Sequence, residues 1–229
     1  MAVITVSRQI GSLGDRIAEK VAEVLGYEYV DRRLVEEIAA ITDTTVSEVE
    51  AFDEKGEGPV RRFLRRLLVP EVSPGTFPLS AAAYASELGL EFAYVNEVSA
   101  REPTYLDRGT YQLLITTLVQ DFGQTGKAVI VGRASQVILG NHPQACHVKV
   151  VAPRDVRCQR LAECESMPLE SARRLVDQHD QWRKDYLRST HGADWDDPLL
   201  YHLTINTGRV DWEDAVGIVV EYALKLEGT

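Results

Sequence analysis

The sequence predicts an α/β fold in which a parallel sheet of about five strands is flanked by helices, and three observations support this. Short apolar, β-branched runs alternate along the chain with longer amphipathic segments, as in repeated strand–helix–strand units. Glycines separate the first such run from the helix that follows it. The 229 residues are 45 % hydrophobic and 26 % charged, which is ordinary for one globular domain.

The first strand–helix–strand unit occupies residues 2–30. Ala2–Val6 is a β-branched apolar run typical of a buried strand. Apolar residues at positions 17, 21, 24 and 25 predict an amphipathic helix, which Gly26 is well placed to end. Tyr27–Val30 predicts the second strand. Two strands joined through a helix are parallel, with a right-handed crossover and a buried sheet.

The segment that follows departs from this pattern. Glycines and prolines interrupt residues 54–78, which also contain a strongly basic stretch, Val60–Leu68. We expect a helical insertion over residues 54–105 rather than part of the sheet. A longer helix over Leu106–Phe122 then returns the chain to the core.

The second half predicts three more strands and their helices, within a single domain of residues 1–229. The strands are expected at Ala128–Val131, His147–Val151 and Leu203–Ile205. Pro153 opens a helix after the second of these. A long polar helix is predicted over Ser166–Arg188 with Ser166 as its N-cap, and Asp211 is expected to cap the last helix.

Composition and charge argue against several classes of binding partner and of structural site. The formal charge of −10 argues against a general electrostatic grip on nucleic acid. Three cysteines, Cys146, Cys158 and Cys164, form no disulfide framework, and they lack metal-site spacing. The N-terminus does not resemble a signal peptide, and no run is apolar and long enough to span a membrane. We expect a cytoplasmic protein without nucleic-acid or membrane partners, and homo-oligomerisation stays open.

The segment Ser7–Arg16 lies where parallel α/β sheets bind ligands, after the carboxyl end of a strand. A glycine-rich turn at a helix N-terminus directs backbone N–H groups and the helix dipole toward an anion. Gly11 and Gly14 permit the tight path. However, SRQIGSLGDRIA lacks the lysine and hydroxyl residue of GxxxxGK[ST], and Arg8 and Arg16 are the nearby cations. The residues alone leave open a phosphate-binding loop or a plain strand–helix turn.

Several segments together resemble the cytidylate kinase-like family, which is related to bacterial cytidylate kinase among the P-loop nucleoside monophosphate kinases. In ITVSRQIGSLGDRIAEKVAEVLGYEYVDRRLVEEIA, the family's glycine-rich pattern is matched except that Leu13 stands in place of a glycine. The segments AVIVGRASQVIL, VVAPRDVRCQRLAE, DQWRKDYLRSTHGADW and LTINTGRV continue the resemblance. It covers most of residues 1–50 and 125–225, and it fades between Glu54 and Arg101.

The resemblance implies a P-loop kinase-like fold that transfers the γ-phosphoryl group of ATP, with Mg²⁺, to a nucleoside monophosphate. CMP or dCMP is the first acceptor it suggests. Residues 165–196 are expected to form a lid, and residues 54–105 the acceptor-binding region. The expected cofactor-binding residues are Gly11, Ser12, Gly14, Asp15 and Arg16. The expected catalytic cations are Arg8, Arg133 and Arg183, and the expected acceptor ligands are Asp31, Arg133 and Arg157.

Two other functions remain open. The fold does not fix the acceptor, so a kinase for another small metabolite is one alternative. The missing loop lysine and hydroxyl favour a second, a non-catalytic nucleotide-binding or regulatory protein. Some candidates have a structural interpretation as an alternative to the functional one. In that interpretation Asp180 and Arg183 form an ordinary i,i+3 pair on a helix, Arg133 forms a structural salt bridge, and Asp31 caps a helix.

Overall fold

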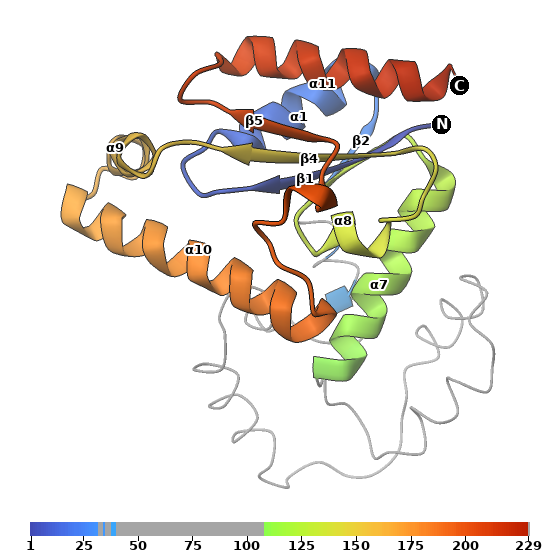
Figure 1. The fold of residues 1–229 in the computed structure, drawn as a ribbon, viewed down its shortest axis with the longest axis horizontal. Coiled ribbons are helices and arrows are strands. Elements are labelled where there is room, and N and C mark those ends of the chain that lie inside the picture. The colour runs from blue at the N-terminus through green and yellow to red at the C-terminus, as the bar shows by residue number, and fades with distance from the viewer. Residues whose placement is uncertain (32–33, 35–37, 40–107, 229) are drawn as a thin grey trace, which may run out of the picture. The chain divides into compact units, whose positions relative to one another are not determined.

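A computed structural model describes residues 1–31, 34, 38–39 and 108–228 of the chain (Figure 1). The chain divides into two compact units, residues 1–31 with 116–229, and residues 32–115. The first unit contains the sheet. The predicted insertion over residues 54–105, and the basic stretch within it, lie outside the described residues.

The sheet has five parallel strands in the order β2-β3-β1-β4-β5, which confirms the predicted fold class. β1 is central, and its Val6 is in register with Val131 of β3 and Val148 of β4. The carboxyl ends of these strands therefore meet at one edge of the sheet. The strands are β1 (Val3–Arg8), β2 (Glu28–Val30), β3 (Ala128–Val131), β4 (Ala145–Val151) and β5 (Leu203–Asn206).

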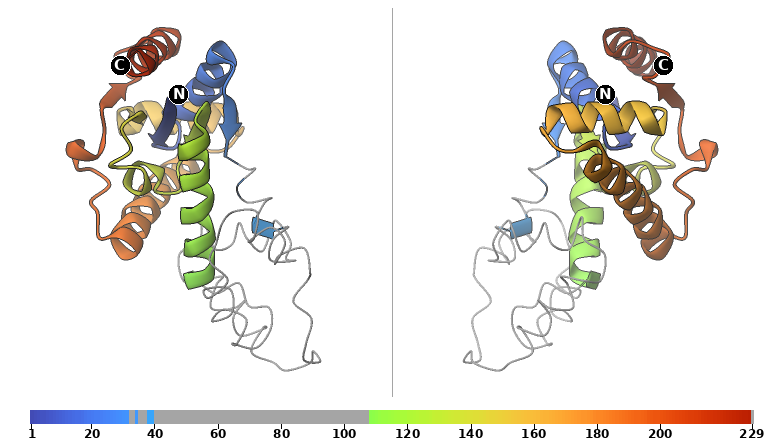
Figure 2. Two further views of the ribbon diagram at one scale, coloured as in Figure 1. Left: turned by 90° about the vertical axis from the view of Figure 1, so that its right-hand side faces the viewer. Right: turned by 90° about the vertical axis from the view of Figure 1, so that its left-hand side faces the viewer.

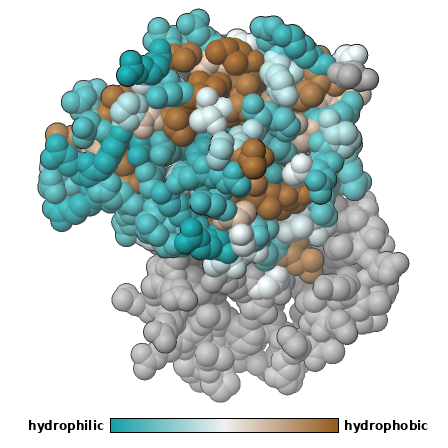
Figure 3. Space-filling model, in the orientation of Figure 1, coloured by the Kyte–Doolittle hydropathy of each residue, from teal (hydrophilic) through white to brown (hydrophobic). Residues whose placement is uncertain are grey.

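Helices cover both faces of this sheet. Figures 1 and 2 show α1 and α11 over one face, with α8 and α10 on the opposite side. The outer surface of α9 and α10 is mostly hydrophilic (Figure 3). The helices are α1 (Gly14–Leu25), α7 (Arg108–Thr125), α8 (Ser135–Ile138), α9 (Arg154–Cys164), α10 (Leu169–His191) and α11 (Trp212–Glu227), and a 3₁₀ turn η1 spans Pro198–Leu200.

The two faces of the sheet differ in chemistry. Alternate residues of the strands, among them Val6, Val131 and Val148, join α1 and α11 in one apolar cluster. The intervening positions of β1 and β4 carry buried polar side chains instead: Thr5, Ser7, His147 and Lys149. The face toward α10 is therefore able to hold polar groups at the edge where the strands end.

One helix starts later than predicted, and one predicted cap residue makes no capping hydrogen bond in the part of the chain that is described. α10 begins at Leu169 rather than Ser166, because Ser166 has a positive φ of 50° and belongs to the turn that ends α9. In that turn the N–H of Met167 bonds back to the carbonyl of Ala162 at 3.0 Å. Asp211 does occupy the N-cap of α11, but among the described residues its side chain makes no capping hydrogen bond. Helix α8 and the turn η1 were not predicted, since both are too short to show a period.

Candidate functional site

The loop between β1 and α1 depends on glycine at two positions. Gly11 and Leu13 both have left-handed backbones, with φ of 74° and 65°. A Cβ on Gly11 would lie 2.6 Å from the carbonyl oxygen of Arg157, and a Cβ on Gly14 would lie 2.4 Å from the Cβ of Arg8. Any larger residue at either glycine would displace the loop.

The N-terminus of α1 follows the loop at the carboxyl end of β1. Its N-cap is Leu13, whose side chain cannot accept a hydrogen bond, and no side-chain cap is found within the described residues. The first amides of the helix thus lack the partner that a serine or aspartate cap would provide. Unpaired N–H groups and the positive end of the helix dipole favour an anion at this point.

Internal hydrogen bonds hold the loop in shape. The buried Ser12 donates from its Oγ to the carbonyl of Gln9 at 2.6 Å. The Gln9 side chain accepts from the N–H of Ala152 at 3.1 Å, beyond the end of β4. Thr207, after β5, donates to the carbonyl of Ser12 at 2.8 Å. The hydroxyl of Ser12, an expected cofactor-binding residue, thus donates its hydrogen bond within the loop itself.

Arg8 brings a positive charge to the mouth of the loop. Its Nε lies 2.7 Å from the Asp15 carboxylate, and its Nη2 lies 3.6 Å from that of Asp31. A Cβ on Gly132, after β3, would lie 2.8 Å from Nη1 of the same guanidinium. The structure therefore brings together three predicted site residues from the ends of β1 and β2 and the start of α1. Burial, and then the nearby Asp31 and Asp15, raise the pKa of Tyr29 to about 12.

Arg133 follows β3 in an unusual turn. Gly132, Arg133 and Ala134 are three consecutive left-handed residues, with φ of 75°, 58° and 55°. The N–H and Oγ of Ser135 close the turn on the carbonyl of Gly132, at 3.0 and 2.7 Å. Each left-handed residue other than glycine costs about 1–3 kcal/mol, and such strain is concentrated at functional sites. No local pattern predicts this turn, because arginine and alanine rarely adopt a left-handed backbone.

The side chains of Arg8 and Arg16, the two cations expected to act together at the loop, point in different directions. Arg16 is exposed on the first turn of α1, and its guanidinium carbon lies 3.7 Å from the ring centroid of Trp212 on α11. Arg8 instead lies against Asp15 and Asp31. Cation–π stacking is worth about 0.5–1 kcal/mol at an exposed site, which leaves Arg16 able to turn toward a ligand.

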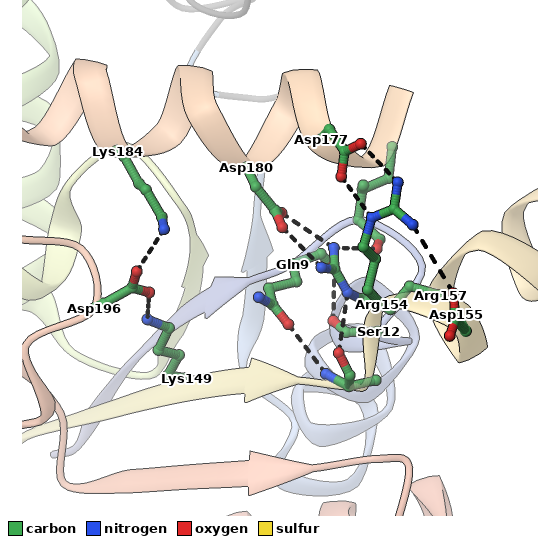
Figure 4. A network of polar contacts seen from close by, with 12 residues as sticks. Gln9, Ser12, Lys149, Arg154, Asp155, Arg157, Asp177, Asp180, Lys184 and Asp196 are labelled. Atoms are coloured by element: carbon green, nitrogen blue, oxygen red, sulfur yellow. Dashed lines mark hydrogen bonds and ion pairs between the residues drawn. The ribbon is translucent and has the colours of Figure 1, made fainter. Parts of the chain in front are cut away.

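The other two predicted arginines belong to the α9–α10 pair. Arg157 is buried on α9, where it binds Asp180 and two backbone carbonyls (Figure 4). Its expected role as an acceptor ligand stays a prediction. Arg183 lies on α10, within the predicted lid, and is half-buried. Its expected role in catalysis also stays a prediction.

A second polar group was missed by the sequence analysis. Lys149 of β4 donates from Nζ to the carbonyl of Trp195 at 2.6 Å and to the carboxylate of Asp196 at 2.9 Å. Lys184 of α10 lies 2.7 Å from the other oxygen of Asp196 (Figure 4). Burial would raise the pKa of Asp196, but the two lysines hold it below its ordinary value. The alternation of polar and apolar residues in HVKVV was the available signal, since it places His147 and Lys149 on one face.

The donor set at the loop mouth suits a magnesium nucleotide. No cluster of three histidine, cysteine or acidic residues that could hold a metal occurs in the part of the chain that the structure describes. Asp15 and Asp31 converge on Arg8 at the loop, and carboxylate oxygens are hard ligands of the kind Mg²⁺ accepts. Mg²⁺ usually binds through one or two carboxylates, substrate phosphates and waters, so these residues fit a nucleotide-borne ion.

Comparison with known proteins decides the family. A model of the cytidylate kinase-like family matches residues 3–209. The chain belongs to this family. It is 30 % identical over 161 residues to a cytidylate kinase of Methanothermobacter thermautotrophicus, covering 69 % of this chain and 92 % of the relative. It is 24 % identical over 162 residues to a cytidylate kinase of Pyrobaculum arsenaticum, covering 71 % and 83 %.

A solved structure shares the fold of this protein. An uncharacterized protein from Eubacterium ventriosum aligns with a TM-score of 0.63 at 17 % identity, covering 97 % of this chain and 98 % of its own. Shikimate kinase from Acinetobacter baumannii aligns with a TM-score of 0.49 at 14 % identity, covering 98 % and 94 %. The family supports a nucleotide-binding kinase with a P-loop fold. None of the described helices is long and apolar enough to cross a membrane.

Proposed function

We propose that the protein transfers the γ-phosphoryl group of ATP to a nucleoside monophosphate, with CMP or dCMP as the first acceptors to test. The observation that supports this proposal most is the geometry of the β1–α1 loop. Gly11 packs closely on the backbone carbonyl of Arg157, and the N-terminus of α1 has no side-chain cap among the described residues. Such a loop receives phosphate through backbone N–H groups. Two relatives that the chain matches over most of their length are cytidylate kinases, which supports the choice of acceptor.

The donor phosphates bind at the loop. The backbone from Gly11 to Gly14 and the first turn of α1 supply N–H donors, and the positive charge comes from Arg8 and Arg16. Phosphoryl transfer demands little covalent chemistry from the protein, so positioning and charge neutralisation dominate. Mg²⁺, when bound with the nucleotide, neutralises charge on the donor phosphates. Asp15 and Asp31 would orient its waters.

The acceptor and the transferring group face the ends of β2 and β3. Asp31 orients the acceptor, and Arg133 binds its phosphate from the strained turn after β3. Arg183 of α10 donates its forked N–H groups to the equatorial oxygens of the transferring group. Residues 165–196 act as the lid that excludes water during transfer.

One observation favours a second candidate, a nucleotide-binding protein without turnover. The loop has no lysine, and two carboxylates already surround the charge of Arg8. If Arg8 stays bound to Asp15 and Asp31 when nucleotide is present, the phosphates receive less positive charge than in a conventional P-loop.

An ADP-release assay with ATP, Mg²⁺ and a panel of monophosphates separates these functions. We expect turnover with one monophosphate, and its loss in Arg183→Ala. Arg174→Ala is the matched control, because Arg174 is exposed on the same helix α10. ATP binding without turnover on any acceptor would support the second candidate. No ATP binding would overturn both.

A further inference from the structure

Arg157 is a buried cation in which all three guanidinium nitrogens donate hydrogen bonds. Its side chain is 4 % exposed. Nε donates to the carbonyl of Ala152 at 3.1 Å, after the end of β4. Nη1 and Nη2 donate to the two carboxylate oxygens of Asp180 at 3.1 and 2.7 Å, and Nη1 also lies 3.4 Å from the carbonyl of Ile10. One guanidinium thus joins β4, α10 and the β1–α1 loop.

The loop rests on Arg157 through two consecutive residues. The carbonyl of Ile10 faces the guanidinium, and the Cα of Gly11 packs on the backbone carbonyl of Arg157 so closely that a Cβ would come within 2.6 Å. The side chain and the main chain of one residue therefore support the loop where its backbone turns left-handed.

Asp180 determines where the guanidinium lies. Its carboxylate is 19 % exposed and binds the fork through both oxygens, the geometry that fixes the plane of an arginine. Removing one partner of a buried pair leaves an uncompensated charge that must move toward water. Loss of Asp180 would therefore withdraw Arg157 from the Ile10 carbonyl as well as from α10.

A second arginine–aspartate pair joins the same two helices and can be compared with the Arg157–Asp180 pair. One turn toward the N-terminus of both, Arg154 binds Asp177 through two hydrogen bonds of 2.7 Å each. This pair is exposed, at 44 % and 59 %, and in the described part of the chain the bonds of Arg154 go to acidic residues of α9 and α10 (Figure 4). Both pairs join α9 to α10, but the Arg157–Asp180 pair also contacts the loop.

We propose that Arg157 is a positioning residue of the phosphate loop, fixed in place by Asp180. It sets the backbone of residues 10 and 11 from behind, and it makes the placement of α10 part of the loop's geometry. This assigns Arg157 to the support of the donor site rather than to the acceptor. The inference rests on the proposed function only in taking the loop as the site of the nucleotide phosphates.

The test compares Asp180→Asn with Asp177→Asn in the full chain. Amide hydrogen exchange of the segment 7–16 is measured without nucleotide, Mg²⁺–ATP affinity by calorimetry, and global stability by thermal unfolding. We expect Asp180→Asn to speed exchange of the loop amides and to weaken ATP binding, each about tenfold, the size of one charge-assisted hydrogen bond. Asp177→Asn should leave both near the wild-type values.

A second variant covers the case in which Asp180→Asn does not fold. The apolar double substitution Arg157→Met with Asp180→Leu leaves no buried charge, so the core is retained while the Ile10 contact is lost. It should show the same loop exchange and the same weak ATP binding. Arg157→Lys keeps the positive charge but not the forked geometry of the guanidinium. It should retain at most part of the wild-type ATP affinity.

Equal loop exchange and equal ATP affinity in the Asp180 and Asp177 variants would overturn the inference. A rise in acceptor KM alone, with ATP affinity unchanged, would also overturn it and support Arg157 as an acceptor ligand. If the wild-type chain binds no ATP, the proposed function fails instead, and loop exchange still decides whether Arg157 positions the loop.

Discussion

The indole Nε1 of Trp195 donates a hydrogen bond of 2.8 Å to the Oγ of Ser7, across 188 residues of sequence. Both residues are buried, and Ser7 lies in β1 directly before the loop. The carbonyl of Trp195 is itself held by Lys149 and by the hydroxyl of Tyr201. The segment after α10 is thus attached to the strand that leads into the candidate phosphate site.

Trp195→Phe tests this attachment, because it removes the N–H donor and keeps an aromatic ring. We expect the free energy of unfolding to fall by about 1–3 kcal/mol, since a buried hydroxyl loses its partner. Urea denaturation measures the change. Trp182→Phe is the control, as Trp182 is half-buried on α10, and its loss should be smaller. Equal losses would show that the hydrogen bond to Ser7 contributes nothing.

Gly11→Ala tests the close backbone contact of the loop. The new Cβ would lie 2.6 Å from a backbone carbonyl, at a φ of 74° that alanine disfavours. We expect a loss of about 1–3 kcal/mol in stability and weaker ATP binding. Gly217→Ala on α11 is the control, because a Cβ there meets nothing within 4 Å. Alanine in that helix should raise stability by about 0.5–1 kcal/mol. Normal ATP affinity in Gly11→Ala would contradict the loop assignment.

Ser166→Gly tests the turn between α9 and α10. Ser166 is exposed with a φ of 50°, so glycine should relieve strain and raise stability by about 0.5–1 kcal/mol. Ser171→Gly, inside α10, should lower it by a similar amount, because glycine is unfavourable within a helix. Chemical denaturation of both variants gives the comparison, and a destabilised Ser166→Gly would argue against the left-handed turn.

The buried His147 should make the free energy of unfolding depend on pH. Burial, and then the neighbouring His202, lower the pKa of His147 from 6.5 to about 4. The folded protein thus keeps His147 neutral where the unfolded chain binds a proton. Stability from this group is complete above pH 6.5 and is lost as the pH falls toward 4, by on the order of 3 kcal/mol.

Urea titrations at intervals between pH 4 and pH 7 measure this slope. In His147→Gln the slope should be shallower than in the wild-type protein. The pKa of His191 is also lowered by burial, so part of the dependence remains in this variant. A His147→Gln protein with an unchanged slope would show that this histidine is not the source.

Local patterns were enough to predict the sheet and the loop. Apolar runs separated by amphipathic segments predicted all five parallel strands, and Gly26 ends α1 as expected, with a φ of 64°. The helix after Pro153 also begins as predicted. Ser166 misled the prediction of α10 because serine suits a helix cap as well as a turn. Its positive φ and the bond from Met167 to Ala162 identify the turn.

The supports of the site could not be predicted, because they join residues far apart in sequence. Arg157 reaches the carbonyl of Ile10 across 147 positions. Lys149 reaches the carbonyl of Trp195 across 46 positions and the carboxylate of Asp196 across 47. The resemblance to the family identified Arg157 as a cation near the site but not the side of the loop from which it acts. The pairing of Arg8 with Asp31 likewise depends on the strand order, which periodicity does not reveal.

The central place of β1 has a consequence for biosynthesis. Its two neighbours in the sheet are β3 and β4, which begin at Ala128 and Ala145. A ribosome must therefore make more than half of the protein before the first strand gains a partner on either side. Until then an apolar segment, Ala2–Val6, stays uncovered, and such segments aggregate most readily during slow, long-range pairing. Nascent chains that stall before residue 128 should therefore need chaperones far more than those that stall after residue 151.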